Sequence, residues 1–311
     1  MTDLKQLPGP ATTDPLVADD AGVAARELPV RWSIGQRLRS ALADIARRPG
    51  LLLSIVWAVI VVLAAFVPDL LTSVDPLRAQ PKQKLLAPSL SHLFGTDQLG
   101  RDLYSRTVHG AGLSLGAALI AVAVGLVIGS LLGLLAGFLR GWVDESLMRV
   151  VDVLLAIPAL LLSLALVTAL GFGTIKVAIA VGISSIAACA RVMRSEVLRV
   201  REGTYVEAAE AGGARRGRVL FRHVLPNSTG PVLVLATLEI GTAILAVSSL
   251  SFLGYGAAPP APEWGSLIAD GRNYLANAWW LSTLPGLTVA ALVLSVNRIA
   301  RALDGEWAAF R

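Results

Sequence analysis

Six long runs without charged residues are the feature that most constrains this chain. The runs cover residues 49–68, 110–139, 153–175, 177–190, 227–252 and 281–297, and only Glu239 interrupts one of them. A helix that crosses the hydrocarbon core of a bilayer needs about 20 mostly apolar residues. Because 55% of the 311 residues are hydrophobic and 16% are charged, the chain is predicted to be an all-α polytopic membrane protein with six transmembrane helices.

Two of the runs differ in length from a single span. The 30 residues of 110–139 exceed what one bilayer needs at about 1.5 Å per residue, so this helix should tilt or protrude. The run at 177–190 is short. Lys176 can extend its ammonium group to the interface, which lets the fourth helix begin near Gly173 and end near Met193.

The distribution of lysine and arginine predicts the orientation. With the N-terminus inside, the inner segments that flank the spans carry 18 of these residues and the outer segments carry seven. Cytoplasmic loops are enriched in lysine and arginine, so both termini are expected in the cytoplasm. The pI near 9.8 does not imply a nucleic-acid partner, because the basic residues lie beside apolar spans, where membrane lipid is the partner.

These features divide the chain into four parts. Residues 1–48 are expected to form a cytoplasmic tail with a basic segment next to the membrane. Residues 49–110 hold the first helix and an extracytoplasmic segment. The other five helices form a core at 111–300, and residues 301–311 form a second cytoplasmic tail.

A polar, arginine-containing island separates the fourth and fifth runs. It extends from Thr204 to Pro226. Thr204 and Glu207 have the spacing of a capping box, which predicts a short helix that begins here. Gly212-Gly213 should end that helix, because glycine readily adopts the αL conformation at a helix C-terminus. A second short helix, 214–224, is expected to run up to Pro226.

The spacing within this island resembles the EAA loop of ABC importer permeases, whose helix fits a cleft on a cytoplasmic ATPase. Glu207-Ala208-Ala209 is followed after three residues by Gly213 and after nine more by His223-Val224-Leu225-Pro226. The resemblance implies that residues 194–226 form a coupling loop. The residues expected to couple the chain to an ATPase are Glu207, Ala208, Ala209, Gly213, His223, Leu225 and Pro226.

Two alternatives stay open for this island. Glu207 can act only as part of the capping box, a role that is compatible with docking as a polar anchor. The arginines at 215, 216, 218 and 222 can be ordinary basic residues of a cytoplasmic loop.

A second stretch, His92–Gly110, resembles the FGTDxxGRD signature of the C-type permease in the peptide and nickel class of importers. Further ordered matches extend the resemblance over about 200 residues; they lie at 149–158, 190–200, 250–256 and 262–271. Asp97, Arg101 and Asp102 of the signature are candidate contacts for an extracytoplasmic binding protein. Mutual pairing of these three side chains is the alternative that their charges favour.

Glu239 is a carboxylate near the middle of the fifth span. At that depth it should not face lipid, because a buried charge costs several kcal/mol unless it is paired, protonated or hydrated. Three interpretations stay open: it lines the translocation path, it bonds a partner permease, or it stays protonated against a serine or threonine of a neighbouring span. The family usually has a glutamate shortly before its LSFLG motif, where this chain has Val247.

Several chemistries are absent from the sequence. No G-x-x-x-x-G-K-[ST] motif occurs, and none of the four lysines lies in a glycine-rich loop, so the chain should not bind ATP itself. One cysteine and three scattered histidines do not form a metal site. No nucleophile elbow or paired intramembrane carboxylate supports an enzyme, and Glu239 alone is a weak basis for an ion-coupled carrier.

The expected protein is therefore a permease subunit with the type I ABC importer fold in the inner membrane of a bacterium. The resemblance implies a homologous permease as heterodimer partner, two ATPase subunits that hold ATP and Mg²⁺, and an extracytoplasmic substrate-binding protein. Peptides or a related solute are the implied cargo. A secondary transporter or channel is the alternative from another class.

Overall fold

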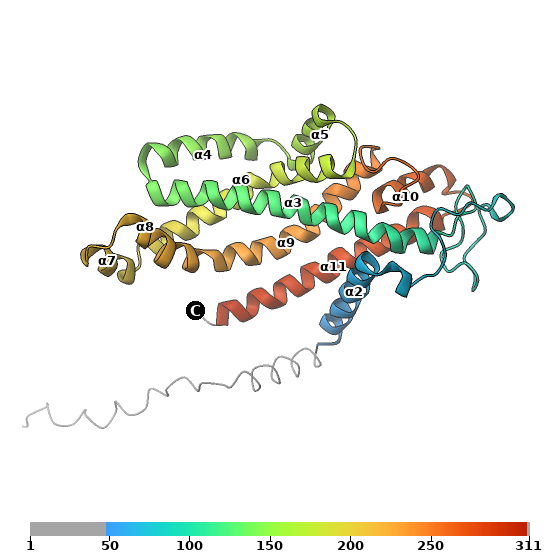
Figure 1. Cartoon of the computed structure of the whole chain (residues 1–311), viewed down its shortest axis with the longest axis horizontal. Helices are drawn as coiled ribbons and strands as arrows, with labels where there is room; N and C mark the ends of the chain where they lie inside the picture. The colour runs from blue at the N-terminus through green and yellow to red at the C-terminus, as the bar shows by residue number, and fades with distance from the viewer. Residues whose placement is uncertain (1–47, 310–311) are drawn as a thin grey trace, which may run out of the picture. The chain divides into compact units, whose positions relative to one another are not determined.

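The structure is a computed structural model that describes the backbone of residues 48–309 and the side chains of residues 48–302. The expected tail at 1–48 therefore lies outside the described residues, apart from Arg48. Between Arg48 and Ala309 the chain is helical and has no strand, only one isolated bridge between Thr96 and Asp102 (Figure 1).

The α-helices connect in a simple order, with short 3-10 and π turns between some of them. The elements are α2 (Pro49–Phe66), η1 (Pro68–Leu70), η2 (Pro81–Gln83), α3 (Leu103–Leu139), α4 (Gly141–Ala156), α5 (Ala159–Leu170), α6 (Thr174–Arg201), α7 (Thr204–Ala211), α8 (Arg216–Val219), η3 (Leu220–Val224), α9 (Leu225–Phe252), α10 (Trp264–Gly271), η4 (Arg272–Tyr274) and α11 (Trp280–Ala309).

Five of these helical segments are long and apolar enough to cross a membrane, and there are six spans if the bent pair α4–α5 is counted as one. The all-α, multi-pass prediction is thus confirmed. The prediction of one continuous third span at 153–175 is wrong, because α4 and α5 meet at 94°. The break lies at Ile157-Pro158, and Ile157 is extended at φ −94° and ψ 128°. A proline disfavours the α conformation of the residue before it, which accounts for the break.

The fifth span is also longer than predicted. The expected separate helix 214–224 is wrong: α8 continues through the π turn η3 into α9, and Arg216–Phe252 forms one apolar helical segment of 37 residues. Pro226 lies in the first turn of α9. Proline lacks an N–H group and disrupts the interior of an α-helix, but here it follows directly after the π turn, where the α-helical bonding pattern is already interrupted.

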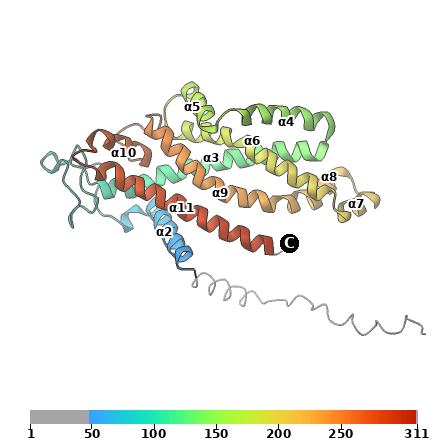
Figure 2. The same cartoon turned by 180° about the vertical axis from the view of Figure 1, so that it is seen from behind.

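The closest helix pair, α3 and α6, runs side by side along a row of glycines (Figures 1 and 2). Gly125, Gly129, Gly133 and Gly137 lie four residues apart on α3, and all four are buried. A Cβ atom at Gly129 would lie 2.6 Å from the Cβ atom of Cys189 on α6. Small residues at this spacing let two membrane helices approach closely, so α3 and α6 pack as one unit.

The bundle has two distinct ends (Figures 1 and 2). We call the end that carries α7 and α8 the turn end. The cap end carries residues 67–102 and α10. The helix α11 continues beyond the last apolar run, which ends at 297, and its helical backbone includes most of the expected tail at 301–311.

Candidate functional site

The turn end is held to the bundle by a small apolar cluster. Val206 on α7 is buried with Val197 of α6, and Val219 and Val224 of the following turns belong to the same cluster. Each of these valines is at most 1% exposed. The short helix α7, which is too short to be stable alone, is therefore fixed in place by packing.

The helix α7 ends as its two glycines predict. Gly213 has φ +79°, a left-handed conformation in which an L side chain would be strained. The N–H of Ala214 donates to the carbonyl of Ala209, and the N–H of Gly213 donates to the carbonyl of Glu210. This pair of bonds is a Schellman motif, which satisfies the last carbonyls of the helix and reverses the chain.

The predicted capping box is wrong. The N-cap of α7 is Gly203, so Thr204 is already the first helical residue, and no side chain caps the helix. Glu207 therefore has no capping bond, and its side chain is exposed in the first turn of α7. The interpretation of Glu207 as only a capping residue loses its support.

The other predicted coupling residues lie around the same turn. Ala208, Gly213 and Pro226 are exposed, whereas Ala209, His223 and Leu225 are half-buried. The glutamate, the small residues and the glycine are thus gathered at the surface of one turn, with the valine cluster beneath it. Such a surface lets another protein's backbone approach closely.

Ion pairs that the sequence analysis did not predict hold α4 against α6 near this end. Arg194 of α6 forms a bidentate pair with Asp144 of α4, at 2.5 and 2.7 Å. Arg191 pairs with Asp152 at 2.5 Å. The acidic and basic partners lie about 40 to 50 residues apart in sequence, so no local spacing identifies them.

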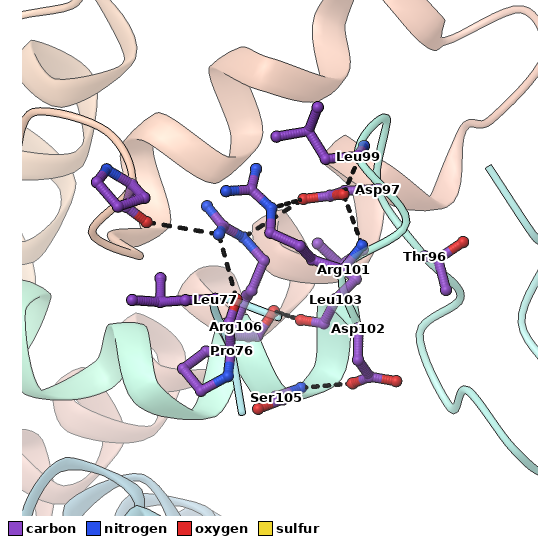
Figure 3. A network of polar contacts seen from close by, with 12 residues as sticks. Pro76, Leu77, Thr96, Asp97, Leu99, Arg101, Asp102, Leu103, Ser105 and Arg106 are labelled. Carbon is purple, nitrogen blue, oxygen red and sulfur yellow. Dashed lines mark hydrogen bonds and ion pairs between the residues drawn. The ribbon is translucent and has the colours of Figure 1, made fainter. Parts of the chain in front are cut away.

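At the cap end, Asp97 and Arg101 pair with each other (Figure 3). The Nε atom of Arg101 donates to Asp97 Oδ2 at 2.6 Å, and the backbone N–H groups of Leu99 and Arg101 donate to Asp97 Oδ1. Asp97 is 4% exposed and Arg101 is 6% exposed. Both side chains organise the signature turn internally, which disfavours them as contacts for a binding protein.

Asp102 has a structural role as well. It is the N-cap of α3, where its Oδ1 accepts from the N–H of Ser105 at 2.8 Å (Figure 3). Its other oxygen lies 2.8 Å from Nδ1 of His92. Aspartate is among the preferred N-cap residues because it satisfies a free N–H of the first turn. Asp102 thus starts the 37-residue helix α3.

Arg106 is a buried cation that the sequence analysis did not single out. Its NH1 atom donates to the carbonyls of Pro76 and Pro260, at 3.4 and 3.5 Å, and its Nε atom lies 3.7 Å from Asp97 Oδ2 (Figure 3). Burial raises the pKa of the nearby Asp270 carboxyl above its usual range, and the positive charge of Arg106 opposes that shift. Arg106 joins three segments of the cap end.

Another buried carboxylate, Glu263, fixes α10. It accepts from the hydroxyl of Ser251 at 2.5 Å and from the N–H of Ala257 at 2.7 Å, and it is fully buried. The next residue, Trp264, donates from its indole to the carbonyl of Thr107 on α3. The helix α10 is thus fixed to both α9 and α3.

Glu239 lies on α9 with only hydroxyl groups as hydrogen-bond donors. Ser185 of α6 donates to its Oε2 at 3.4 Å, and Thr242 donates at 3.1 Å. The Glu239 side chain is half-buried, and Thr242, one turn further on, is exposed. No ion pair of residues 48–302 involves Glu239. The serine contact agrees with the third interpretation, but it leaves the second oxygen without a donor from the described side chains.

The apolar helices define a multi-pass helical membrane protein. Residues 129–307 match the family model described as the binding-protein-dependent transport system inner membrane component. The chain belongs to that family. Among similar curated proteins, the dipeptide transport system permease protein DppC of Alkalihalophilus pseudofirmus is 41% identical over 243 residues, which cover 78% of this chain and 80% of that protein.

Other relatives carry related names. The probable D,D-dipeptide transport system permease protein DdpC of Escherichia coli is 42% identical and covers 79% of this chain and 83% of its own. The glutathione transport system permease protein GsiD of Shigella flexneri is 45% identical over 70% of this chain and 71% of its own.

Solved structures agree on the fold. A chain of the inward-facing methionine ABC transporter MetNI superposes with a TM-score of 0.53 at 20% identity, over 65% of this chain and 97% of that one. A chain of an amino acid ABC transporter with histidines gives the same TM-score at 13% identity, over 65% and 94% of the two chains. At these identities the match shows the fold alone.

Proposed function

We propose that this permease carries peptides, with both termini in the cytoplasm, and that the turn end docks a cytoplasmic ATPase. The proposal of peptides is supported by the names of relatives that are 41% and 42% identical to this chain. In this proposal a homologous permease forms the other half of a heterodimer. Two ATPase subunits hold ATP and Mg²⁺, and a binding protein delivers the solute to the opposite face.

The observation that carries the docking proposal is the Schellman turn at Gly213. It presents Glu207, Ala208 and the glycine on one exposed surface, while Val206 on the other side of α7 is buried. A short helix with small exposed residues and a buried anchor is suited to insert into a cleft, because its backbone can come close to the cleft wall. Movement of the ATPases would then reach α6 and α9, which flank the turn.

For the path itself, we propose that Glu239 faces the solute. A half-buried carboxylate with an exposed threonine beside it is suited to a wet surface between two permeases, and cationic or amide groups of a peptide would supply the missing donors. Further along α9, the exposed residues Leu245 and Ser249 line a groove of about 410 Å³ with α11. The exposed side of α9 thus offers both polar and apolar contacts.

A substitution at Gly213 tests the docking proposal. Gly213→Leu should release the ATPase subunits, because a branched side chain in the left-handed region costs about 1–2 kcal/mol and holds the turn away from its partner. The measurement is copurification of ATPase subunits with the tagged permease. Gly141→Leu is the matched control, since Gly141 also has a positive φ, +61°, and open space around it, but it begins α4 and lies outside α7 and α8. Full retention of the ATPases by Gly213→Leu would contradict the proposal.

A further inference from the structure

Three exposed arginines lie where α2 begins and where α11 leaves the last apolar run. They are Arg48, directly before α2, and Arg298 and Arg301 of α11. None of them appears in the ion pairs formed by residues 48–302. The chain around them, 48–60 and 290–302, includes no Asp or Glu. This surface therefore presents a positive charge that its own segments do not neutralise.

The position of Arg298 depends on a glycine of α2. A Cβ atom at Gly50 would collide with Cζ and both terminal nitrogens of Arg298, and these three atoms would lie at the same distance from it. The guanidinium plane therefore lies face-on to the backbone of Gly50. The N–H groups of a guanidinium lie in its plane, so those of Arg298 point past α2 and stay available to a ligand.

This contact brings the ends of two apolar runs to one level. The run 49–68 begins directly after Arg48, and the run 281–297 ends directly before Arg298. The helices α2 and α11 that contain these runs lie side by side (Figures 1 and 2). Arginine side chains at the end of an apolar span extend their charge into the headgroup layer. Guanidinium groups of two helices therefore reach that layer next to each other.

Apolar side chains adjoin these charges. Leu53, in the first turns of α2, is 70% exposed, and Leu294, one turn before Arg298, is 68% exposed. A small soluble anion such as free phosphate would contact the arginines alone. A phospholipid, by contrast, carries its phosphate next to its acyl chains, which is the arrangement of charged and apolar groups on this surface.

We propose that Arg48 and Arg298 bind the phosphate of an anionic phospholipid, whose acyl chains lie against the exposed leucines of α2 and α11. Arginine suits this role because its planar fork of donors matches the geometry of a phosphate. A basic residue near the surface of an anionic membrane also gains attraction from it. A lipid bound here would connect α2 to α11. The inference is independent of the docking proposed at the turn end and of the cargo.

Native mass spectrometry of the assembled importer, titrated with phosphatidylglycerol, tests the site. Gly50→Ala keeps every charge but places a methyl group where the guanidinium of Arg298 lies. The affinity for the first phosphatidylglycerol should therefore fall about fivefold, the contribution of one basic residue near a membrane surface. Arg298→Gln should cause a similar loss. Phosphatidylcholine with the same acyl chains should bind equally to all variants.

Two matched controls separate the site from general effects. Gly116→Ala adds a methyl group in open space, and Arg149→Gln removes the charge of an exposed arginine that pairs with Glu145. Neither should change the affinity for phosphatidylglycerol. Equal affinity of Gly50→Ala and Gly116→Ala would overturn the inference, even if Arg298→Gln binds less, because charge alone would then explain the loss. Phosphatidylglycerol should also raise the unfolding midpoint of the wild type above its value in phosphatidylcholine, and a rise of the same size in Gly50→Ala would overturn the inference too.

Photocrosslinking shows what covers the surface in a membrane. Benzoylphenylalanine replaces Leu53, or replaces Phe66 at the other end of α2, which is 77% exposed. The importer is placed in vesicles of phosphatidylethanolamine and phosphatidylglycerol. We expect a higher ratio of phosphatidylglycerol to phosphatidylethanolamine adducts at position 53 than at position 66. Equal ratios, or an adduct of position 53 with another protein subunit, would overturn the inference.

Discussion

Carboxylates in this molecule differ in the donors that surround them. Asp97, Asp102 and Glu263 are buried, and each accepts at least one backbone N–H together with a bond from a side chain. Glu239 differs, because its two donors are hydroxyl groups at 3.1 and 3.4 Å. Structural carboxylates in proteins are normally well satisfied. Because the set of hydrogen-bond donors around Glu239 is incomplete, we infer that its carboxylate meets a group outside this chain.

Glu239→Gln tests that argument. The amide keeps the shape but removes the charge, so solute uptake should fall about tenfold, since a hydrogen bond to a charged group contributes roughly 1.5–3 kcal/mol. Basal ATPase activity and assembly should survive. Glu145→Gln is the control, because Glu145 is an exposed partner of Arg149. Unchanged uptake would leave only a structural role for Glu239, and loss of the permease pair would point to the interface with the partner.

The sequence predicted the residues of the cap end better than their roles. The charges of Asp97 and Arg101, four residues apart, already favoured mutual pairing, which the structure shows. The role of Glu263 could not be predicted from the sequence. Its donors Ser251 and Ala257 come close to it only because the chain after α9 folds back on the end of that helix. Local spacing carries information about turns and caps, whereas burial depends on contacts between distant segments.

At the scale of elements, the apolar runs located the spans but not their breaks. Pro158 lies inside the run 153–175, and its steric effect on Ile157 separates α4 from α5. The hydrophobicity of the run alone does not indicate this break between α4 and α5. The π turn before α9 is a similar case, because it lies within the polar island 204–226, where no apolar run indicates a helix. The glycines of α3 have a regular four-residue spacing in the sequence, which is typical of a close helix contact but does not identify α6 as the partner.

Two alanine substitutions on α3 test this contact. A Cβ atom at Gly133 would collide with the backbone carbonyl of Ala190, whereas one at Gly116 meets nothing within 4 Å. Gly133→Ala should therefore destabilise the bundle by about 1–3 kcal/mol, the usual cost of overpacking. Gly116→Ala should be neutral or slightly stabilising. Thermal unfolding midpoints in detergent compare the two variants, and equal midpoints would contradict the close packing of α3 against α6.

At the scale of the whole molecule, the two ends have different chemistry. The cap end is closed by the ion pairs of Asp97 with Arg101 and Arg106 and by the hydrogen bonds that Glu263 accepts. The turn end exposes small residues and arginines that lack partners among the described side chains. If ATPases act at the turn end, as we propose, their movement needs a rigid connection to the cap end, and α3 supplies one. This helix is capped by Asp102 at the cap end. Near its other end, the carbonyl of Phe138 accepts a hydrogen bond from the guanidinium group of Arg201.

The orientation of the two ends is testable with thiol labelling. In a Cys189→Ser background, Pro81→Cys should react with an impermeant reagent added from outside, and Arg218→Cys should react only after the membrane is opened. Both positions are exposed in the structure, so burial would not explain a lack of reaction. The reverse pattern would place the turn end outside the cell and would contradict docking of a cytoplasmic ATPase.

We propose that the chain moves peptides only when ATPases act through its turn end. The most direct measurement is uptake of a labelled dipeptide into proteoliposomes that hold the permease pair and both ATPases, with the binding protein added. We expect uptake to require ATP and the binding protein, to be lost with Gly213→Leu, and to persist with Gly141→Leu. Uptake driven by an ion gradient without ATP, or ATP-driven uptake that Gly213→Leu leaves unchanged, would contradict the account.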